Sequence, residues 1–240
     1  MKTALLTCAL ALCFFLNNSD AQTLRKYTRL DFFFGLCFHP YQLSDPGGQI
    51  KDELVDGFSG GVEVTVDYSD VFSVGGGLII KPQNYSVNLE GSQSDVGTEG
   101  MNTLQLPLCL QARKHIGPRK KAIAYLQGGG ALGFNLNYRD GVIGGGGSGN
   151  LRRTVDVGLK RIFPLLFTGA GIEAPVYIGL TESETKVLRL GFSARRFFGF
   201  TDIMRVHAEY MSGGNSFMAT QNYQGGYWMF NLHVVFALEH

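Results

Sequence analysis

Residues 104–112 read LQLPLCLQA, and every second side chain among them is apolar. Leu104, Leu106, Leu108, Leu110 and Ala112 share one side of an extended chain, and the residues between them share the other. A β-strand sorts side chains in this way, because its successive side chains point to opposite faces. The stretch therefore predicts a strand with one apolar face.

The same alternation recurs through most of the chain. Residues 30–38 read LDFFFGLCF and residues 228–238 read WMFNLHVVFAL. Similar runs occupy residues 58–68, 71–82, 122–139, 164–178, 186–198 and 203–213. These runs predict strands, and the weaker stretch Leu151–Ile162 is a candidate for one more.

Short and long connections separate the predicted strands. Tight turns are expected at residues 69–70, 115–121 and 199–202, and longer polar or glycine-rich stretches at 42–56, 84–101, 140–150 and 214–224. This pattern is typical of an up-and-down barrel with short periplasmic turns and longer external loops. The sequence thus predicts an all-β, up-and-down antiparallel transmembrane β-barrel of about 8 to 10 strands, since even numbers are normal. Ten strands follow if 151–162 contributes one, and eight if 203–213 belongs to an external loop.

The composition of the second face indicates which face is outside. It is rich in glycine, which weakens an exposed strand but makes room inside a narrow barrel. It also carries most of the charge, whereas a charge facing lipid at mid-membrane costs about 2–4 kcal/mol. We therefore expect an apolar outer face and a polar network in the lumen; a soluble lipocalin-like barrel, with its apolar face inward, is the alternative. The predicted lumen residues are Arg29, Asp31, Glu63, Asp67, Arg113, Glu173, Arg189, Arg195, Arg205, His207 and Glu209.

Large aromatic side chains lie close to the ends of the predicted strands. Phe72, Tyr138, Phe198, Phe200 and Trp228 occupy such positions. Aromatic residues form girdles where a membrane barrel crosses the two interfaces. These positions are therefore expected to mark the edges of the membrane-facing band.

The N-terminus has the pattern of a secretory signal. Lys2 precedes an apolar run from Ala4 to Leu16, and small residues stand at Ser19 and Ala21. The run is too short to span a hydrocarbon core of ~30 Å as a helix. We expect residues 1–21 to be a cleaved signal peptide and residues 22–240 to form a single outer-membrane β-barrel domain.

Two cysteines, Cys37 and Cys109, remain after the predicted cleavage. In an exported chain they would form one disulfide or stay as two free thiols that pack as small apolar groups. Free thiols are the favoured alternative.

Catalytic and metal motifs are weak. A hydroxyl nucleophile needs a base within hydrogen-bond reach, and the best candidates are His207 and Ser212. Their spacing puts them on opposite faces of one strand, so the segment from Arg205 to Glu209 is better explained as polar lumen. The histidines lack metal-ligand spacing, and a net charge of +1 offers no field for nucleic acid. We expect no catalytic, cofactor or metal residues, and a protein that is not an enzyme.

Four short motifs resemble a known family. They are residues 20–22 (DAQ), 104–108 (LQLPL), 128–133 (GGGALG) and 168–173 (TGAGIE). In this order they resemble the small outer-membrane β-barrel proteins of Bacteroidetes-type bacteria, which include PorT-like and OmpX-like barrels. The resemblance implies an outer-membrane location and favours eight strands. The family that it points to includes members with no known activity and members that are accessory parts of protein secretion.

The expected function is that of a non-enzymatic outer-membrane protein, a structural or accessory subunit of a secretion or surface-assembly machinery. Its expected partners are outer-membrane lipid, lipopolysaccharide and other outer-membrane or periplasmic proteins, with no nucleic acid. Two alternatives stay open. One is a lipid A-modifying hydrolase and the other is a narrow small-solute channel, although a barrel of about eight strands is narrow enough for side chains to fill.

Overall fold

The computed structural model describes residues 27–40, 42–48, 50–51, 55–83, 88–89, 101–117, 121–136, 145–148, 151–157, 160–176 and 188–239. Regular structure in these ranges is β-strand. Among the described residues, no helix has the length and apolar character needed to cross a membrane. The predicted signal peptide, residues 1–21, lies outside the described ranges.

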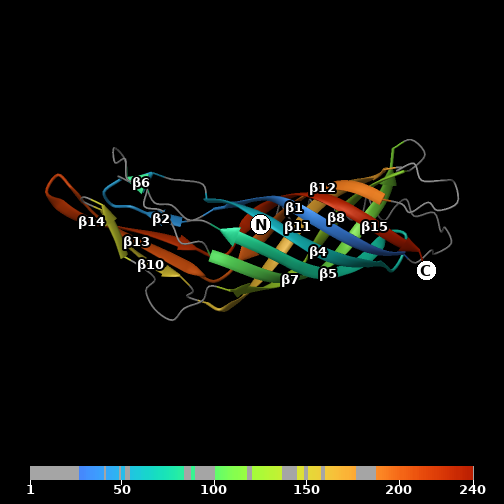
Figure 1. Cartoon of the computed structure of the whole chain (residues 1–240), viewed down its shortest axis with the longest axis horizontal. Coiled ribbons are helices and arrows are strands. Elements are labelled where there is room, and N and C mark those ends of the chain that lie inside the picture. Colours follow the sequence, from blue (N-terminus) through green and yellow to red (C-terminus); the bar gives the residue numbers. More distant parts are fainter. Residues whose placement is uncertain are drawn as a thin grey trace, which may run out of the picture.

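Eight antiparallel strands close into a barrel, in the order β1-β15-β12-β11-β8-β7-β5-β4 (Figure 1). Neighbouring strands follow each other along the chain, and β1 pairs with β15 to complete the ring. The predicted up-and-down, all-β barrel is confirmed, with the lower of the two strand counts. The strands are β1 (Tyr27–His39), β4 (Val55–Asp67), β5 (Phe72–Gln83), β7 (Met101–Ile116), β8 (Ala122–Asn135), β11 (Ile162–Val176), β12 (Leu188–Gly199) and β15 (Tyr227–Glu239).

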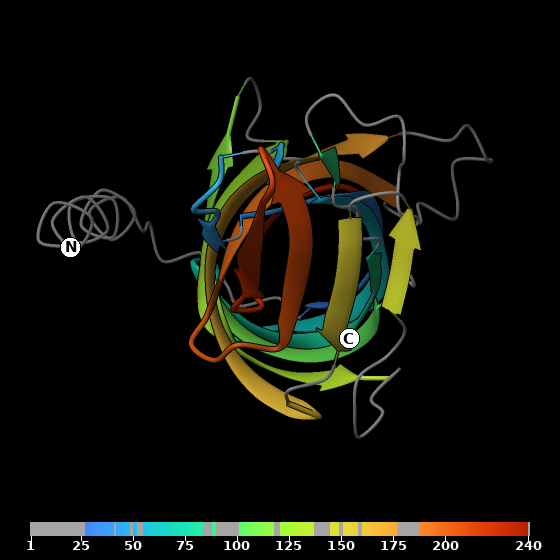
Figure 2. The same cartoon turned by 90° about the vertical axis from the view of Figure 1, so that its left-hand side faces the viewer.

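A second, five-stranded sheet extends beyond one end of the barrel (Figures 1 and 2). We call it the external sheet. Its order is β2 (Gln42–Ser44), β14 (Asn215–Tyr223), β13 (Met204–Ser212), β10 (Leu151–Val157) and β9 (Gly145–Ser148). A short pair, β3 (Ile50–Lys51) with β6 (Asn88–Leu89), forms a third sheet.

The runs at 203–213 and 151–162 are therefore not barrel strands, which corrects the ten-strand alternative. Both do form strands, β13 and β10, and they pair with each other in the external sheet. Alternation of side chains indicates a strand but carries no information about which sheet the strand joins.

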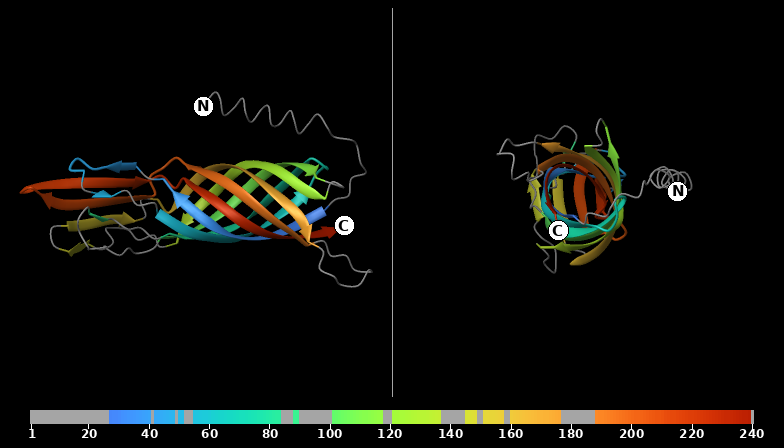
Figure 3. Two further views of the ribbon diagram at one scale, coloured as in Figure 1. Left: turned by 90° about the horizontal axis from the view of Figure 1, so that it is seen from above. Right: turned by 90° about the vertical axis from the view of Figure 1, so that its right-hand side faces the viewer.

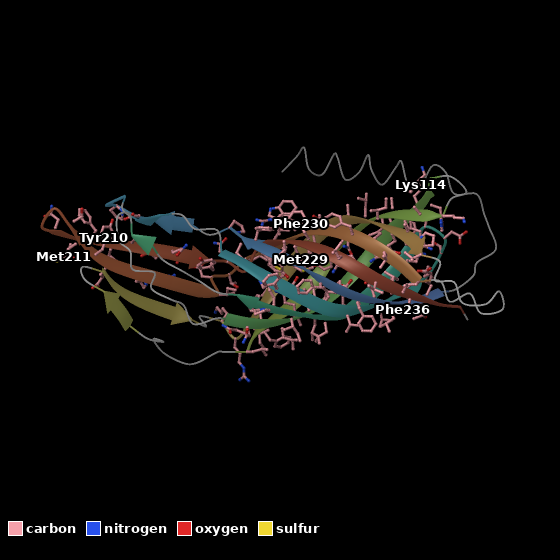
Figure 4. The ribbon with its side chains drawn as sticks, turned by 45° about the horizontal axis from the view of Figure 1, so that its top comes forward. Lys114, Tyr210, Met211, Met229, Phe230 and Phe236 are labelled. Carbon is pink, nitrogen blue, oxygen red and sulfur yellow. The ribbon has the colours of Figure 1, made fainter. Side chains whose placement is uncertain are left out.

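The two ends of the barrel differ. The first barrel strand begins and the last one finishes at one end, which we call the terminal end; Lys114 and Phe236 lie towards it in Figure 4. The opposite end, the loop end, leads to the external sheet (Figure 3), where Tyr210 and Met211 lie far from the barrel (Figure 4). The prediction of a tight turn at 199–202 is wrong, because this segment carries the chain from β12 out to β13.

The barrel has an apolar outer face and a polar inner face. Leu108 and Phe34 point outward with 71% and 58% of their surfaces exposed, whereas Gln105 and Arg195 point inward with 0% and 1% exposed. This orientation excludes the soluble lipocalin-like alternative, in which the apolar face would line the interior.

Inward-facing glycines give the large lumen side chains their space. A Cβ added to Gly77 would lie 2.6 Å from Cγ of Glu63, and one added to Gly169 would lie 3.0 Å from Cγ of Arg195. The expectation that glycine makes room inside the barrel is confirmed at these positions. Cys37 and Cys109 also face inward, as buried free thiols, so the prediction of free thiols is confirmed.

Candidate functional site

The lumen is the candidate site, and charged side chains fill its terminal end. We call this group the basal network: Arg29, Asp67, Arg113, Glu173 and Arg189. Arg29 is the hub, with Nε 3.3 Å from Asp67 Oδ1 and Nη1 3.3 Å from Glu173 Oε1. Arg113 Nη1 lies 2.8 Å from the same Asp67 oxygen, and Arg189 Nε lies 3.6 Å from Glu173 Oε2.

Neutral side chains extend the basal network around the wall. Arg29 Nη2 donates to Gln111 Oε1 at 3.0 Å and to Ser73 Oγ at 3.2 Å. Gln111 Nε2 in turn donates to Gln127 Oε1 at 3.4 Å. The network thus connects strands on several sides of the barrel, and its side chains reach across the lumen at the terminal end.

A second ion pair crosses the middle of the lumen. Arg195 on β12 binds Glu63 on β4 with both terminal nitrogens of its guanidinium group, one on each carboxylate oxygen. The two side chains are 1% and 3% exposed. A bidentate pair holds both groups in a fixed plane. This contact therefore bridges strands that are not neighbours in the sheet.

Three polar side chains form a chain of hydrogen bonds beside this pair. We call them the lumen triad: Ser193, His233 and Asp31, from the adjacent strands β12, β15 and β1. Ser193 Oγ lies 2.6 Å from His233 Nε2, and His233 Nδ1 lies 2.7 Å from Asp31 Oδ2. Since a carboxylate only accepts, Nδ1 carries the proton donated to Asp31 when the imidazole is neutral, and Nε2 then accepts from the hydroxyl.

Aromatic rings and a lysine fill the loop end. Phe167 stacks on Phe197, and Phe197 stacks on Tyr227 with ring centroids 4.4 Å apart. Lys81 Nζ lies 3.6 Å from the centre of the Tyr227 ring and 3.1 Å from His39 Nε2. The Tyr227 hydroxyl donates across the lumen to Gln105 Oε1 at 2.5 Å. The lumen is thus crossed by side-chain contacts at both ends.

The structure places most of the predicted lumen residues together. Arg29, Asp67, Arg113, Glu173 and Arg189 form the basal network. Asp31, Glu63 and Arg195 lie above them in the middle of the lumen.

The prediction for the last three lumen residues is wrong. The structure places them on β13 of the external sheet and not in the lumen: Arg205, His207 and Glu209. Arg205 contacts Asp202 and Asn222 there, and His207 Nδ1 lies 3.1 Å from Thr220 Oγ1. The alternation of these side chains fits a strand of the barrel as well as a strand of the external sheet. Only the pairing of β13 with β10 and β14 shows which sheet it belongs to.

Sequence reasoning missed Ser193 and His233. Their positions did carry a signal, since His233 has the same parity as the inward residues Asn231 and Val235. The bonding partner of His233 could not be read from one strand, because the triad needs three strands in register. No group of three or more histidine, cysteine, aspartate or glutamate side chains in the described ranges is arranged to hold a metal ion.

Comparison with protein-family models gives a match over residues 20–205 to the outer membrane protein beta-barrel domain. The chain belongs to this family. The matched part includes β1 to β12, and β15, which closes the barrel, follows it. The protein is therefore an outer-membrane β-barrel protein, and its apolar outer face is the surface that meets lipid.

Solved structures of outer-membrane proteins are similar to this barrel protein in fold. OprG of Pseudomonas aeruginosa is 13% identical with a TM-score of 0.49, and the match covers 92% of this chain and 99% of that one. AlkL, solved in lipid bilayers, is 13% identical with a TM-score of 0.45 and coverages of 93% and 97%. Ail, the attachment invasion locus protein of Yersinia pestis, is 11% identical with a TM-score of 0.34 and coverages of 89% and 100%. The comparison with curated proteins found no match.

The outer surface of the barrel protein carries aromatic side chains towards both ends. At the loop end Phe198 and Trp228 are exposed, and the guanidinium carbon of Arg196 lies 5.6 Å and 5.4 Å from their ring centres. This outward arginine thus sits against aromatic rings, where a cation is stabilised. Phe236 is exposed towards the terminal end (Figure 4). The predicted girdle residue Tyr138 lies outside the described ranges.

Proposed function

We propose that this outer-membrane barrel is a structural or accessory subunit that presents its external sheet to another protein of a secretion or surface-assembly machinery. In this role the barrel anchors the protein in the membrane, and the external sheet binds the other protein. The observation that carries the proposal is the contrast between a lumen crossed by buried ion pairs and a sheet that stands clear of the barrel (Figure 3).

The filled lumen argues against the channel alternative. Arg195 and Glu63 cross the middle of the barrel, and Arg29 joins Glu173 to Gln111 at the terminal end. A solute that passed through would have to separate charges that are already out of water, and breaking a buried pair costs about 3–5 kcal/mol. A membrane anchor does not need an open passage, so a lumen crossed by ion pairs fits this role.

The external sheet has features of a docking surface. Among the described residues, β2 pairs with only Thr220–Asn222 of β14, so the rest of this edge of β14 could be extended by a strand of another protein. Near its tip Met211 and Met218 expose 54% and 56% of their surfaces. Methionine is common on adaptable binding surfaces because its unbranched chain fits many shapes. By the family pattern, this end of the barrel faces the outside of the cell.

The test is extraction of the protein from native cells in mild detergent, with identification of what co-purifies. Two chains are compared: the full protein, and a variant in which residues 205–222 are replaced by a short turn. Since β12 pairs directly with β15, the variant keeps every barrel strand. We expect a stoichiometric partner with the full protein and its loss with the variant.

Planar-bilayer conductance of the same two preparations separates the channel alternative. Neither preparation should conduct. Extraction of the full protein without a partner, or steady single-channel conductance, would overturn the accessory role.

A further inference from the structure

Arg196 is a charged residue on the outer face of the barrel, where most side chains are apolar. Its neighbours on β12, Arg195 and Phe197, point into the lumen with 1% and 0% of their surfaces exposed, so Arg196 points outward. It lies near the loop end of β12, directly opposite Trp228 in the β12–β15 register. Exposed aromatic rings of a membrane barrel mark the border between hydrocarbon and headgroups. Arg196 therefore lies at this border.

Aromatic rings hold the guanidinium group of Arg196, but no carboxylate in the described ranges pairs with it. Its central carbon lies 5.6 Å from the ring centre of Phe198 and 5.4 Å from that of Trp228. Such rings attract a cation without removing its charge. Nη1 is buried and has no hydrogen-bond partner among the described residues. The lumen arginines, in contrast, pair with carboxylates, as Arg195 does with Glu63.

Hydrogen-bond donors form a row with Arg196 across three adjacent strands. Thr168 on β11 and Trp228 on β15 are its direct partners in the two registers. Both point outward, since Thr168 is exposed and Trp228 is 45% exposed. Cross-strand partners have Cβ atoms about 4.5–5.5 Å apart, so a hydroxyl, a guanidinium group and an indole N–H lie side by side. An anion with several oxygens can accept hydrogen bonds from more than one of them.

The chemistry of this row fits a phosphate group. The planar fork of an arginine donates two parallel hydrogen bonds to a phosphate, and the hydroxyl of Thr168 is a further donor. At the border of the hydrocarbon, the phosphates within reach are those in the headgroups of membrane lipids. The row therefore points to a lipid headgroup.

The surface beside the row suits the acyl chains of such a lipid. Phe230 stacks on Trp228 with ring centroids 6.2 Å apart, and Leu232, further along β15 towards the terminal end, is 68% exposed. A lipid whose phosphate lies at Arg196 would place its acyl chains over this apolar surface. A dissolved phosphate ion would make no such contact, which favours the lipid as the source of the phosphate.

We propose that Arg196, with Thr168 and Trp228, binds the phosphate group of a lipid in the outer leaflet of the membrane. The leaflet follows from the family pattern, in which the loop end of the barrel faces the outside of the cell. The proposal does not depend on the accessory role, because the site lies on the barrel wall and not on the external sheet. It gives the predicted lipid partner a position on the protein.

The experiment measures quenching of Trp228, which is the single tryptophan of the chain and part of the site. The folded full-length protein is placed in vesicles of dioleoylphosphatidylcholine that contain a minor fraction of phosphatidic acid with brominated acyl chains, because bromine quenches an indole that it touches. The reference is the same fraction of brominated phosphatidylcholine, whose phosphate is paired with its own choline. We expect phosphatidic acid to compete for the site about fivefold better, the gain typical of one arginine near an anionic headgroup.

Variants locate the effect. Arg196→Met removes the charge but keeps the length, and it should abolish the preference for phosphatidic acid. Thr168→Val removes one donor at constant volume and should reduce the preference by about twofold or more. The matched control is Arg161→Met, which should keep the preference, because Arg161 is an exposed arginine directly before β11 at the loop end. Each variant is compared with itself in unbrominated vesicles, so changes in the emission of Trp228 cancel.

Inorganic phosphate in the buffer and a brominated fatty acid in the vesicle test the identity of the ligand. Inorganic phosphate should leave the quenching unchanged. The fatty acid, which has a carboxylate in place of a phosphate, should show a weaker preference than phosphatidic acid. Displacement of the lipid by inorganic phosphate, or an equal preference for the fatty acid, would overturn the assignment of a lipid phosphate.

Two results with the variants would also overturn the proposal. One is an unchanged preference in Arg196→Met, and the other is an equal loss in Arg161→Met, which would show a general attraction between charges. Only variants whose unheated gel mobility shows a folded barrel are compared, and Arg196→Gln replaces Arg196→Met if the latter does not fold.

Discussion

The lumen and the external sheet carry the same kinds of side chains in the same alternating pattern, but they hold them in different surroundings. In the lumen, Arg195 and Glu63 form a pair with both side chains at most 3% exposed. Beside the external sheet, Arg205 and Asp202 form a pair with side chains 39% and 30% exposed. The difference shows that residue type and spacing do not fix what a charge contributes to stability.

The physical reason is the solvent. Exposed ion pairs stabilise a protein by about 0–1 kcal/mol, since water already solvates both groups. A buried charge that loses its partner is left without compensation, which costs about 3–5 kcal/mol. We therefore expect the barrel to respond strongly to changes that leave the external sheet almost unaffected.

Removal of Glu63 should have the largest effect. Glu63→Ala leaves the Arg195 guanidinium buried and unpaired, so we expect a loss of about 3–5 kcal/mol in the free energy of unfolding. Urea unfolding in detergent micelles, followed by the fluorescence of Trp228, measures this change. A loss below about 1 kcal/mol would mean that water reaches the pair and that the lumen is open.

A charge on the outer face should have the next largest effect. Leu108 is 71% exposed near the middle of β7. Leu108→Arg should destabilise the folded barrel in lipid by about 2–4 kcal/mol, because the charge would face hydrocarbon. The matched control is Met211→Arg in the external sheet, for which we expect a change within about 0.5 kcal/mol. Equal effects at both positions would contradict the placement of the membrane.

Alanine substitutions at two adjacent glycines test which face of the barrel wall is tightly packed. A Cβ at the inward Gly129 would overlap the backbone carbonyl of Leu108, whereas one at the outward Gly128 would have its nearest neighbour at 3.6 Å. Gly129→Ala should therefore cost about 1–3 kcal/mol by overpacking, and Gly128→Ala much less. The same unfolding measurement applies, and the reverse order would show that the faces are assigned wrongly.

The exposed pair should have the smallest effect. Asp202→Ala removes the carboxylate of the ion pair with Arg205, and we expect a change of less than about 1 kcal/mol that disappears in high salt. Thermal unfolding at low and high ionic strength measures it. A loss as large as that of Glu63→Ala would remove the distinction between the two regions.

The barrel could be predicted from sequence because its signals are local. The alternation around Leu108 and the inward glycines such as Gly129 identified strands, faces and orientation one strand at a time. The β13 residues were misplaced because alternation is identical in a barrel and in a free-standing sheet. The lumen triad was missed because it depends on the register of β12, β15 and β1, which long-range pairing sets.

Closure of the ring through β1 and β15 has a consequence for assembly. Tyr27 pairs with Glu239, so the two most distant described segments of the chain must meet before the wall is complete. Contacts so far apart in sequence form slowly, and until they form, both strands present open edges that readily pair with other chains. The growing polypeptide therefore needs to be kept apart from its own copies until β15 has paired with β1. A chain without β15 would form an open sheet whose edges pair with other chains, and not a smaller barrel.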